Sequence, residues 1–328
     1  MDREHLVALG AGVASALFNL SPLLSAAPGS LILTALGPLP PLAVGLAMGF
    51  YPGALATGIA AVIIALATTV TLGGWFVLTN VVPTVVVIYF ALQSRPGPAG
   101  APAWYPSGHV LAWLTLLGAA YIGGVAVYFS GSESGYAGIG YELLREVLTR
   151  LAVLPGGGEP AGEAAAQIDA FARRIAPYLP GIWIGCWELL FIANAVLAQG
   201  LMVRFGRNLR PPSTLAAMAL PRWIGAAAAA AVVVSFVPGA VGTVAQNVLM
   251  ALCIPFFFLG LAVIHAFSRR WRGRGAHPFL RGAFFVLFYV IILTMVWPAF
   301  VLVGIGIVDM LANIRRRLGR NGPEEEEV

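Results

Sequence analysis

Residues 243–267 read TVAQNVLMALCIPFFFLGLAVIHAF, a stretch that contains no aspartate, glutamate, lysine or arginine. A helix needs about 20 predominantly apolar residues to cross the hydrocarbon core of a bilayer. This stretch is long enough, and it predicts a transmembrane helix. The next segment, 268–281, has no acidic residue and contains Arg269, Arg270, Arg272, Arg274 and Arg281. Cationic residues beside a span are typical of its cytoplasmic end.

The rest of the chain repeats this pattern. Of its 328 residues, 59% are apolar, and the mean hydropathy is +0.87, which suits lipid better than water. Other long apolar runs lie at 5–22, 29–51, 54–72, 75–93, 107–130, 178–203, 222–238 and 281–313. We therefore expect an all-α fold, a polytopic transmembrane helix bundle of about 8–10 spans.

The distribution of arginine predicts the orientation. The chain has no lysine, so its 19 basic side chains are all arginines. Segments 204–222 and 268–281 contain several arginines and no acid, and further arginines precede the acidic C-terminal tail. The positive-inside rule places all three in the cytoplasm. Pro298 interrupts the run 281–313, and a hairpin there would leave both termini on the cytoplasmic side of a bacterial inner membrane.

Composition divides the chain into transmembrane helices at 1–130 and 178–318, a polar insert at 131–177 and an acidic tail at 319–328. The crossing count places the insert outside the cell. It contains two groups of apolar residues at helical spacing, which predict two amphipathic helices. The groups are Leu144, Val147, Leu148 and Leu151, and Ile168, Phe171, Ala172 and Ile175. Two interpretations remain open: a cap that shields the bundle, or a lid over an external entrance.

Several protein classes are disfavoured by what the sequence lacks. Without lysine there is no Walker A lysine, so active transport would need an ion gradient or a partner ATPase. The sequence has no HExxH, no GxSxG and no paired intramembrane carboxylates, and we do not expect an enzyme. Cys186 and Cys253 lie in apolar runs and are expected to pack as small hydrophobes. We expect no metal, no cofactor and no nucleic-acid partner.

Glu188 is the strongest candidate for a functional side chain. It lies in the span GIWIGCWELLFIAN (181–194), where a carboxylate is costly unless it has a partner. Trp183, Trp187 and Asn194 form a stripe on the same helix, and aromatic and amide groups beside a carboxylate are typical of a small-molecule site. The stripe is equally consistent with an interfacial aromatic belt and packing. Glu188 is equally consistent with a structural hydrogen bond to a neighbouring helix.

Other residues suggest structural roles. Asp309 precedes an arginine run that begins at Arg315, which predicts an internal ion pair or a helix-end anchor. Prolines 38, 40 and 41 interrupt the run 29–51, which is typical of a turn or, in transporters, of a binding site. Small residues recur four apart in the first span, a pattern that favours internal packing or docking of another membrane subunit. They are Gly10 with Ala14 and Gly12 with Ala16.

Three stretches resemble a known family. They are MALPRWIG (218–225), LGLAVIHAFSRRW (259–271) and VGIGIVDMLANIRRRL (303–318). They are similar to the C-terminal half of the YybS-like bacterial membrane proteins, whose members distantly resemble the S components of energy-coupling-factor vitamin transporters. The resemblance is best over residues 178–318. It implies a cytoplasmic tail and marks four family-pattern positions, namely Pro221, His265, Asp309 and Arg315.

The leading hypothesis is a membrane protein that binds a small molecule or lipid within its helix bundle, for transport in the manner of an S component. Such a protein docks a membrane-embedded coupling subunit with a separate ATPase. Its ligand site would be lined by Glu188, Trp187, Asn194 and Trp183. The alternative is a non-transporting scaffold or assembly factor that holds cytoplasmic partners through its arginine loops and acidic tail.

Overall fold

The computed structural model describes residues 2–25, 27–97, 100–132, 135–153, 162–273, 278–295, 297–315 and 317. Apart from one short β-hairpin, the regular secondary structure of this described part is helical. The expected all-α fold is therefore confirmed. The acidic tail 319–328 and Arg274 lie outside the described residues.

Seven helical segments are long and apolar enough to span a membrane. They are Arg3–Leu24, Pro28–Met48, Phe50–Ala67, Val70–Ala91, Ser107–Tyr128, Glu163–Arg204 and Ala240–Arg269. Large apolar side chains on these segments, such as Leu66, Val70 and Val127, are exposed. Extensive apolar exposure of this kind marks contact with a membrane or a partner, and on span-length helices it marks lipid. The chain is a multi-pass membrane protein.

The described residues group into two compact units. Unit 1 comprises Met1–Leu114, Leu189–Pro221 and Pro255–Val328, and unit 2 comprises Thr115–Glu188 and Arg222–Ile254. The boundary falls inside three long helices, each of which contributes one end to each unit. These helices are α7 (Ser107–Tyr128), α10 (Leu179–Arg204) and α12 (Ala240–Gly273).

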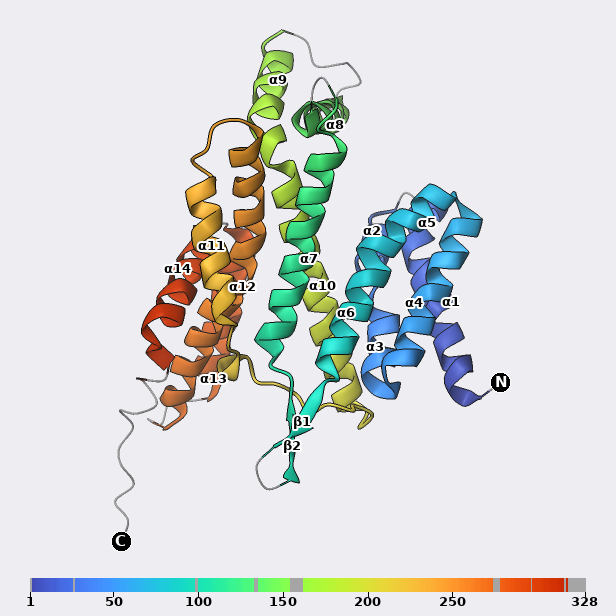
Figure 1. Ribbon diagram of the computed structural model, residues 1–328, viewed down its shortest axis with the longest axis vertical. Helices are drawn as coiled ribbons and strands as arrows, with labels where there is room; N and C mark the ends of the chain where they lie inside the picture. The colour runs from blue at the N-terminus through green and yellow to red at the C-terminus, as the bar shows by residue number, and fades with distance from the viewer. Residues whose placement is uncertain are drawn as a thin grey trace. The chain divides into compact units, whose positions relative to one another are not determined.

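The N-terminal part of unit 1 is a cluster of helices in which α1, α3, α4 and α6 pack side by side (Figure 1). The elements are α1 (Arg3–Leu24), α2 (Pro28–Ala35), α3 (Leu39–Met48), α4 (Phe50–Ala67), α5 (Val70–Phe76), the π-helical turn η1 (Val77–Val81) and α6 (Val82–Ala91). Close packing of α1 on α4 depends on Gly12, because a Cβ there would lie 2.6 Å from the Ala56 carbonyl oxygen. Ala16 continues this buried face, whereas Gly10 is exposed. One of the two expected small-residue pairs therefore serves internal packing.

Proline divides the second apolar run into α2 and α3, with a short turn between them. The turn leaves the Gly37 carbonyl without a helical partner, and the Ser15 hydroxyl of α1 donates a hydrogen bond to it at 2.7 Å. A Cβ on Gly37 would overlap the Asn19 side-chain amide, so glycine leaves room for that amide beside the turn. Irregular backbone at membrane depth is tolerated where protein satisfies it, and here α1 does so.

The remaining elements of unit 1 follow α6. An antiparallel hairpin of β1 (Ser94–Pro96) and β2 (Pro102–Trp104) connects α6 to α7. After α12, the chain forms α13 (Pro278–Thr294) and α14 (Trp297–Ala312). The α12 and α14 backbones cross closely, because a Cβ on either Gly260 or Gly306 would overlap a carbonyl of the other helix.

Two expected spans differ from the sequence-based expectation. The run 281–313 breaks just before Pro298, as expected. The chain bends by 111° between its two helices, whereas an antiparallel hairpin needs a bend close to 180°. It is a broken span or a re-entrant loop. The run 222–238 forms α11 (Arg222–Val234), whose 13 residues extend about 20 Å, less than the hydrocarbon core. The described residues therefore contain seven spans, or eight with the bent pair.

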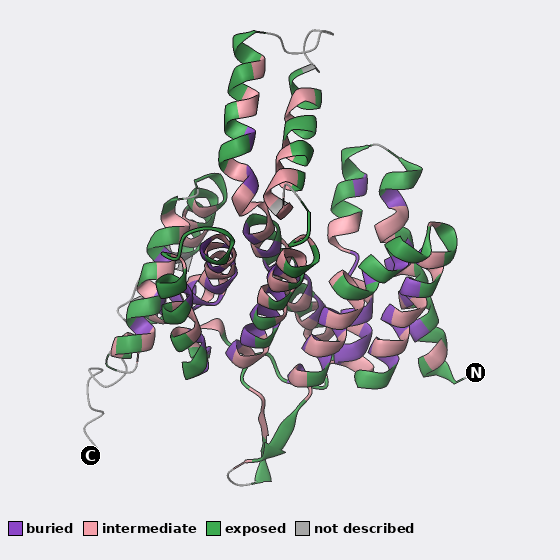
Figure 2. Cartoon of the chain, turned by 45° about the horizontal axis from the view of Figure 1, so that its top comes forward, coloured by how far each residue is buried: buried purple, intermediate pink, exposed green. Residues whose placement is uncertain are grey.

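Unit 2 contains the two expected helices of the polar insert, α8 (Gly135–Val153) and α9 (Glu163–Ile175), which pack against each other. A 3-10 turn, η3 (Ala176–Tyr178), leads from α9 into α10. Leu144, Leu148 and Ile168 are half-buried, and the remaining surface of both helices is largely exposed (Figure 2). The regularly spaced apolar residues of the insert therefore lie on two helices that pack against each other.

Candidate ligand-binding site

Unit 1 contains a cavity of about 580 Å³. Ligand pockets typically measure about 300–1,000 Å³. The cavity wall is formed by Leu46 of α3, the end of α6, the start of α7, the C-terminal half of α10, parts of α12 and α13, and the loop 205–221 that follows α10. The α6, α7 and α10 portions are all next to loops at one end of unit 1, so the cavity lies towards that end.

Most of the cavity wall is apolar. Phe191, Ala195, Gln199 and Val203 follow one another at four-residue spacing on α10, which places them on one face of that helix. Three of the four are apolar, and α7 adds Leu111 and Leu114 among others. Such a wall suits a hydrocarbon group, with a few polar side chains to orient it.

Arg210 is the charged side chain among the described lining residues. Its backbone is held in place, because its carbonyl accepts hydrogen bonds from the Gln199 side-chain amide at 2.8 Å and from the Asn208 amide at 2.9 Å. Pro211 and Pro212 follow, and their fixed φ angles stiffen the loop. The guanidinium therefore occupies a defined position in the wall.

The Arg210 side chain is buried, with only 9% of its residue surface exposed. One of its terminal nitrogens donates a hydrogen bond to the Ala91 carbonyl at 3.1 Å. No ion pair found among the described residues includes Arg210. Burial lowers the pKa of Arg210, although arginine remains charged in proteins. Among the described residues, no carboxylate balances this cation.

The floor of the cavity is fixed by an ion pair. Arg315 donates from Nε to Asp309 at 2.8 Å, and the same side chain donates to the carbonyls of Ala216 and Met218 at 2.9 and 2.7 Å. Met218 lines the cavity. Asn313 takes a left-handed conformation (φ 51°) that ends the last helical turn and lets the chain fold back, so that the Arg315 amide also reaches Asp309. The predicted Asp309 ion pair is therefore present, and it connects the C-terminal helix to the loop.

His265 also supports the wall. Its Nδ1 lies 2.9 Å from the Leu261 carbonyl, and because a carbonyl can only accept, Nδ1 is the donor. In the neutral ring, Nε2 then accepts a hydrogen bond from the Tyr289 hydroxyl, 3.3 Å away. Leu261 and Tyr289 both line the cavity. The His265 ring thus ties α12 to α13.

The four positions marked by the family resemblance therefore lie around one feature. His265 and Arg315 contact residues of the cavity wall or of the loop that forms it, and Asp309 holds Arg315 through their ion pair. Pro221 is buried at the end of the loop 205–221. Sequence analysis marked these residues as a pattern but did not predict that they support the elements around a cavity.

Glu188 lies in unit 2 and is fully buried. The Thr115 hydroxyl of α7 donates a hydrogen bond to its Oε2 at 3.3 Å, and its Oε1 has no hydrogen-bond partner among the described residues. Oε1 lies against Gly118, where a Cβ would be only 2.6 Å away. The carboxyl group therefore sits at a close contact between α7 and α10.

The other three predicted site residues have different environments. In unit 2, Trp187 is half-buried and makes an edge-to-face contact with Tyr121 at 5.7 Å, whereas Trp183 is 65% exposed. In unit 1, Asn194 is buried and its amide nitrogen donates to the carbonyls of Ala35 and Leu190, at 2.8 Å each. Asn194 ties α10 to the end of α2 and is not part of the cavity wall.

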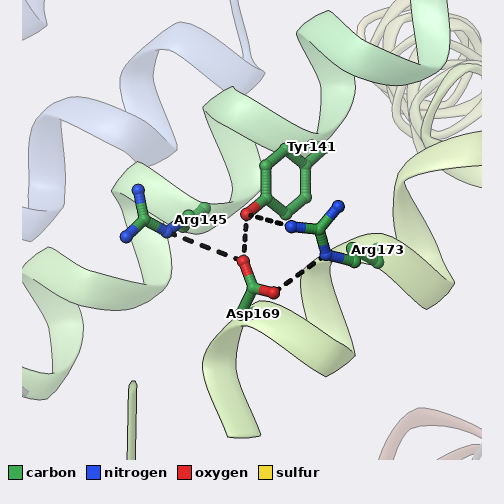
Figure 3. Close-up of polar contacts among 4 residues, drawn as sticks. All are labelled: Tyr141, Arg145, Asp169 and Arg173. Atoms are coloured by element: carbon green, nitrogen blue, oxygen red, sulfur yellow. Dashed lines mark hydrogen bonds and ion pairs between the residues drawn. The ribbon is translucent and has the colours of Figure 1, made fainter. Parts of the chain in front are cut away.

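A polar cluster joins α8 to α9 in unit 2 (Figure 3). Asp169 accepts hydrogen bonds from the Tyr141 hydroxyl and from Arg173 Nε, the latter at 2.8 Å. Arg145 lies 3.9 Å from the same carboxylate, and the Arg173 guanidinium lies over the Tyr141 ring at 4.7 Å. The hydrogen bonds from Tyr141 and Arg173 lower the pKa of Asp169. Both arginines of the cluster are exposed, whereas Tyr141 and Asp169 are half-buried, which is typical of a structural contact near the surface.

Within the described ranges, no group of three or more histidine, cysteine, aspartate or glutamate side chains is arranged to hold a metal ion. Sequence analysis treated Arg210 as a marker of topology and missed its place in the cavity wall. The signal available in the sequence was its setting, because two prolines fix the loop immediately after it. Arg207, another arginine of the same loop, is exposed in the structure.

The fold and this site define the chain as a multi-pass α-helical membrane protein with a largely apolar cavity. No protein-family model matches the chain, and no curated protein or solved structure matches it.

Proposed function

We propose that this protein binds a small molecule or lipid in the unit 1 cavity. The observation that supports the proposal is the cavity itself, which is about 580 Å³ in volume and has a largely apolar wall around one buried cation. Ligand sites are typically concave, mostly apolar and lined by a small number of polar groups that orient the ligand. The unit 1 cavity has the size and the lining of such a site.

The arginine-rich loop 205–221 forms part of the wall, and the positive-inside rule puts that loop in the cytoplasm. The cavity would then lie towards the cytoplasmic face of a bacterial inner membrane. With the bent pair α13 and α14 counted as an eighth span, both termini would also lie inside the cell. The resemblance to YybS-like proteins and S components extends the proposal to transport, with a membrane-embedded coupling subunit and a separate ATPase as partners.

The test is to identify what co-purifies with the protein after mild detergent extraction, by mass spectrometry of the intact complex. Ala195→Trp places an indole in the cavity wall. Ala193→Trp is the matched control, because Ala193 is exposed on the same helix and does not line the cavity. We expect one bound species on the wild type and on Ala193→Trp, and none on Ala195→Trp.

A wild-type protein that carries no bound species, or equal loading of the two tryptophan variants, would contradict the proposal. The non-transporting scaffold would then be favoured, since a scaffold does not need the cavity. Thermal unfolding of each variant shows whether a loss of ligand reflects a blocked cavity or a misfolded protein.

A further inference from the structure

We infer that the ligand of the unit 1 cavity is an anionic amphiphile, with its hydrocarbon chain against the apolar wall and its carboxylate or phosphate at Arg210. This inference rests on the proposed function, which requires only that the cavity binds a ligand. It adds the chemical class of the ligand and the residue that recognises it.

The first argument is the unbalanced charge. A buried cation is costly unless an anion or several hydrogen bonds compensate it. Arg210 is buried, one hydrogen bond to the Ala91 carbonyl is found for its guanidinium, and none of the described lining residues is an aspartate or glutamate. An anionic group on the ligand supplies the missing counter-charge. A cationic ligand would be repelled.

The second argument is the position of the charge within the cavity. Arg210 belongs to the loop after α10, outside the spanning segment, whereas Phe191 and Ala195 lie further along α10 towards the membrane interior. The cavity is therefore polar near the membrane surface and apolar away from it. An amphiphile that enters from the lipid leaflet has the same polarity, with its head group at the surface.

The third argument is the hydrogen-bonding capacity beside Arg210. The guanidinium has five N–H donors in a planar fork that fits carboxylate and phosphate oxygens. Ser107 and Ser213 also line the cavity and contribute hydroxyl groups. Because the Gln199 and Asn208 amides hold the Arg210 backbone, the fork is positioned before a ligand binds.

The test compares three probes that share an oleoyl chain and differ in the head group: oleic acid, oleoyl-lysophosphatidic acid and mono-oleoylglycerol. Binding to delipidated protein is measured by titration with intact-complex mass spectrometry. We expect the wild type to bind at least one of the two anionic probes about 10- to 100-fold more tightly than the neutral one, as charge-assisted hydrogen bonds imply. Comparison of the two acids shows whether the head group is a carboxylate or a phosphate.

Arg210→Gln should abolish the preference for the anionic probes over mono-oleoylglycerol, whereas Arg210→Lys should keep part of that preference. Arg207→Gln is the matched control, because Arg207 is an exposed arginine of the same loop. Equal affinity of the wild type for all three probes would overturn the inference, as would an equal loss of preference in Arg207→Gln.

A different result would identify a failure of the proposed function. If the wild type binds none of the three probes and co-purifies with nothing, the cavity is not a ligand site. If Arg210→Gln does not fold, the comparison of the three probes on the wild type still decides the inference.

Discussion

Two aspartate–arginine pairs in this protein have the same N–O distance of 2.8 Å and very different surroundings. Asp309 and Arg315 in unit 1 have side chains that are 4% and 18% exposed. Asp169 and Arg173 in unit 2 are 35% and 67% exposed. Contact geometry therefore does not distinguish the two pairs, and burial does.

The difference in burial matters because the effective dielectric around an ion pair determines how much the pair contributes to the stability of the fold. An exposed pair contributes about 0–1 kcal/mol, whereas removal of one partner from a buried pair costs about 3–5 kcal/mol. The buried pair also holds the loop that forms the cavity floor, through the carbonyls of Ala216 and Met218. The exposed pair is one contact of several in a helical hairpin. We therefore expect the cavity region of unit 1 to be more rigid than the α8–α9 hairpin of unit 2.

The largest expected effect is that of Asp309→Ala, which leaves Arg315 without its carboxylate. We expect the variant to lose about 3 kcal/mol or more of unfolding free energy, and to bind cavity ligand less well because the loop is released. Thermal unfolding in detergent measures the first effect. Asp169→Ala is the matched control, and a melting temperature as low as that of Asp309→Ala would contradict the comparison.

The next effect concerns the glycines that bring α12 and α14 together beside the cavity. A Cβ on Gly306 would overlap the Phe256 carbonyl, whereas nothing lies within 4 Å of a Cβ on Gly304, two residues earlier. Gly306→Ala should cost about 1–3 kcal/mol through overpacking, and Gly304→Ala should be near neutral. Equal melting temperatures of the two variants would show that the close crossing is absent.

A smaller effect is expected at Glu188, the buried acid of unit 2. Glutamine has almost the same shape, and its side-chain oxygen can still accept the hydrogen bond from Thr115. Glu188→Gln should therefore change stability by less than about 1 kcal/mol and leave occupancy of the unit 1 cavity unchanged. Loss of the bound species in this variant would return Glu188 to the ligand site and contradict the present assignment.

The smallest effect is that of pH on the α8–α9 hairpin. Hydrogen bonds from Tyr141 and Arg173 lower the pKa of Asp169. The charged carboxylate therefore stabilises the folded hairpin fully at any pH above the ordinary aspartate pKa. The contribution is lost only as the pH falls through the lowered value. The distribution of distances between spin labels on α8 and α9 should be narrow at neutral pH and should broaden in acid. Asp169→Asn should remove this dependence on pH.

The sequence predicts the membrane helices well because long apolar runs have few alternatives to spanning lipid. The sequence-based predictions are wrong where the length of an apolar run is close to the minimum for a span. Residues 222–238 looked like a span, yet the helix stops at Val234. The run 281–313 breaks before Pro298 as predicted, but no local pattern in the sequence specifies the 111° bend. The close packing of α14 on α12 is likewise visible only in the structure.

The candidate site was less predictable for a physical reason. Glu188 stands out in a sequence because a carboxylate inside a span is rare, whereas Arg210 lies among several loop arginines and looks like a topology signal. Only tertiary structure shows that one of those arginines is buried. The residues that line the cavity, from Leu46 to Tyr289, are brought together by helix packing that no local pattern records.

The most direct measurement is an experimental density map of the wild-type protein in lipid nanodiscs, with no ligand added. The present account predicts elongated non-protein density between α7 and the C-terminal half of α10, ending within hydrogen-bond distance of the Arg210 guanidinium. A map in which side chains close that space, or in which Arg210 points into solvent with no density beside it, would contradict the account.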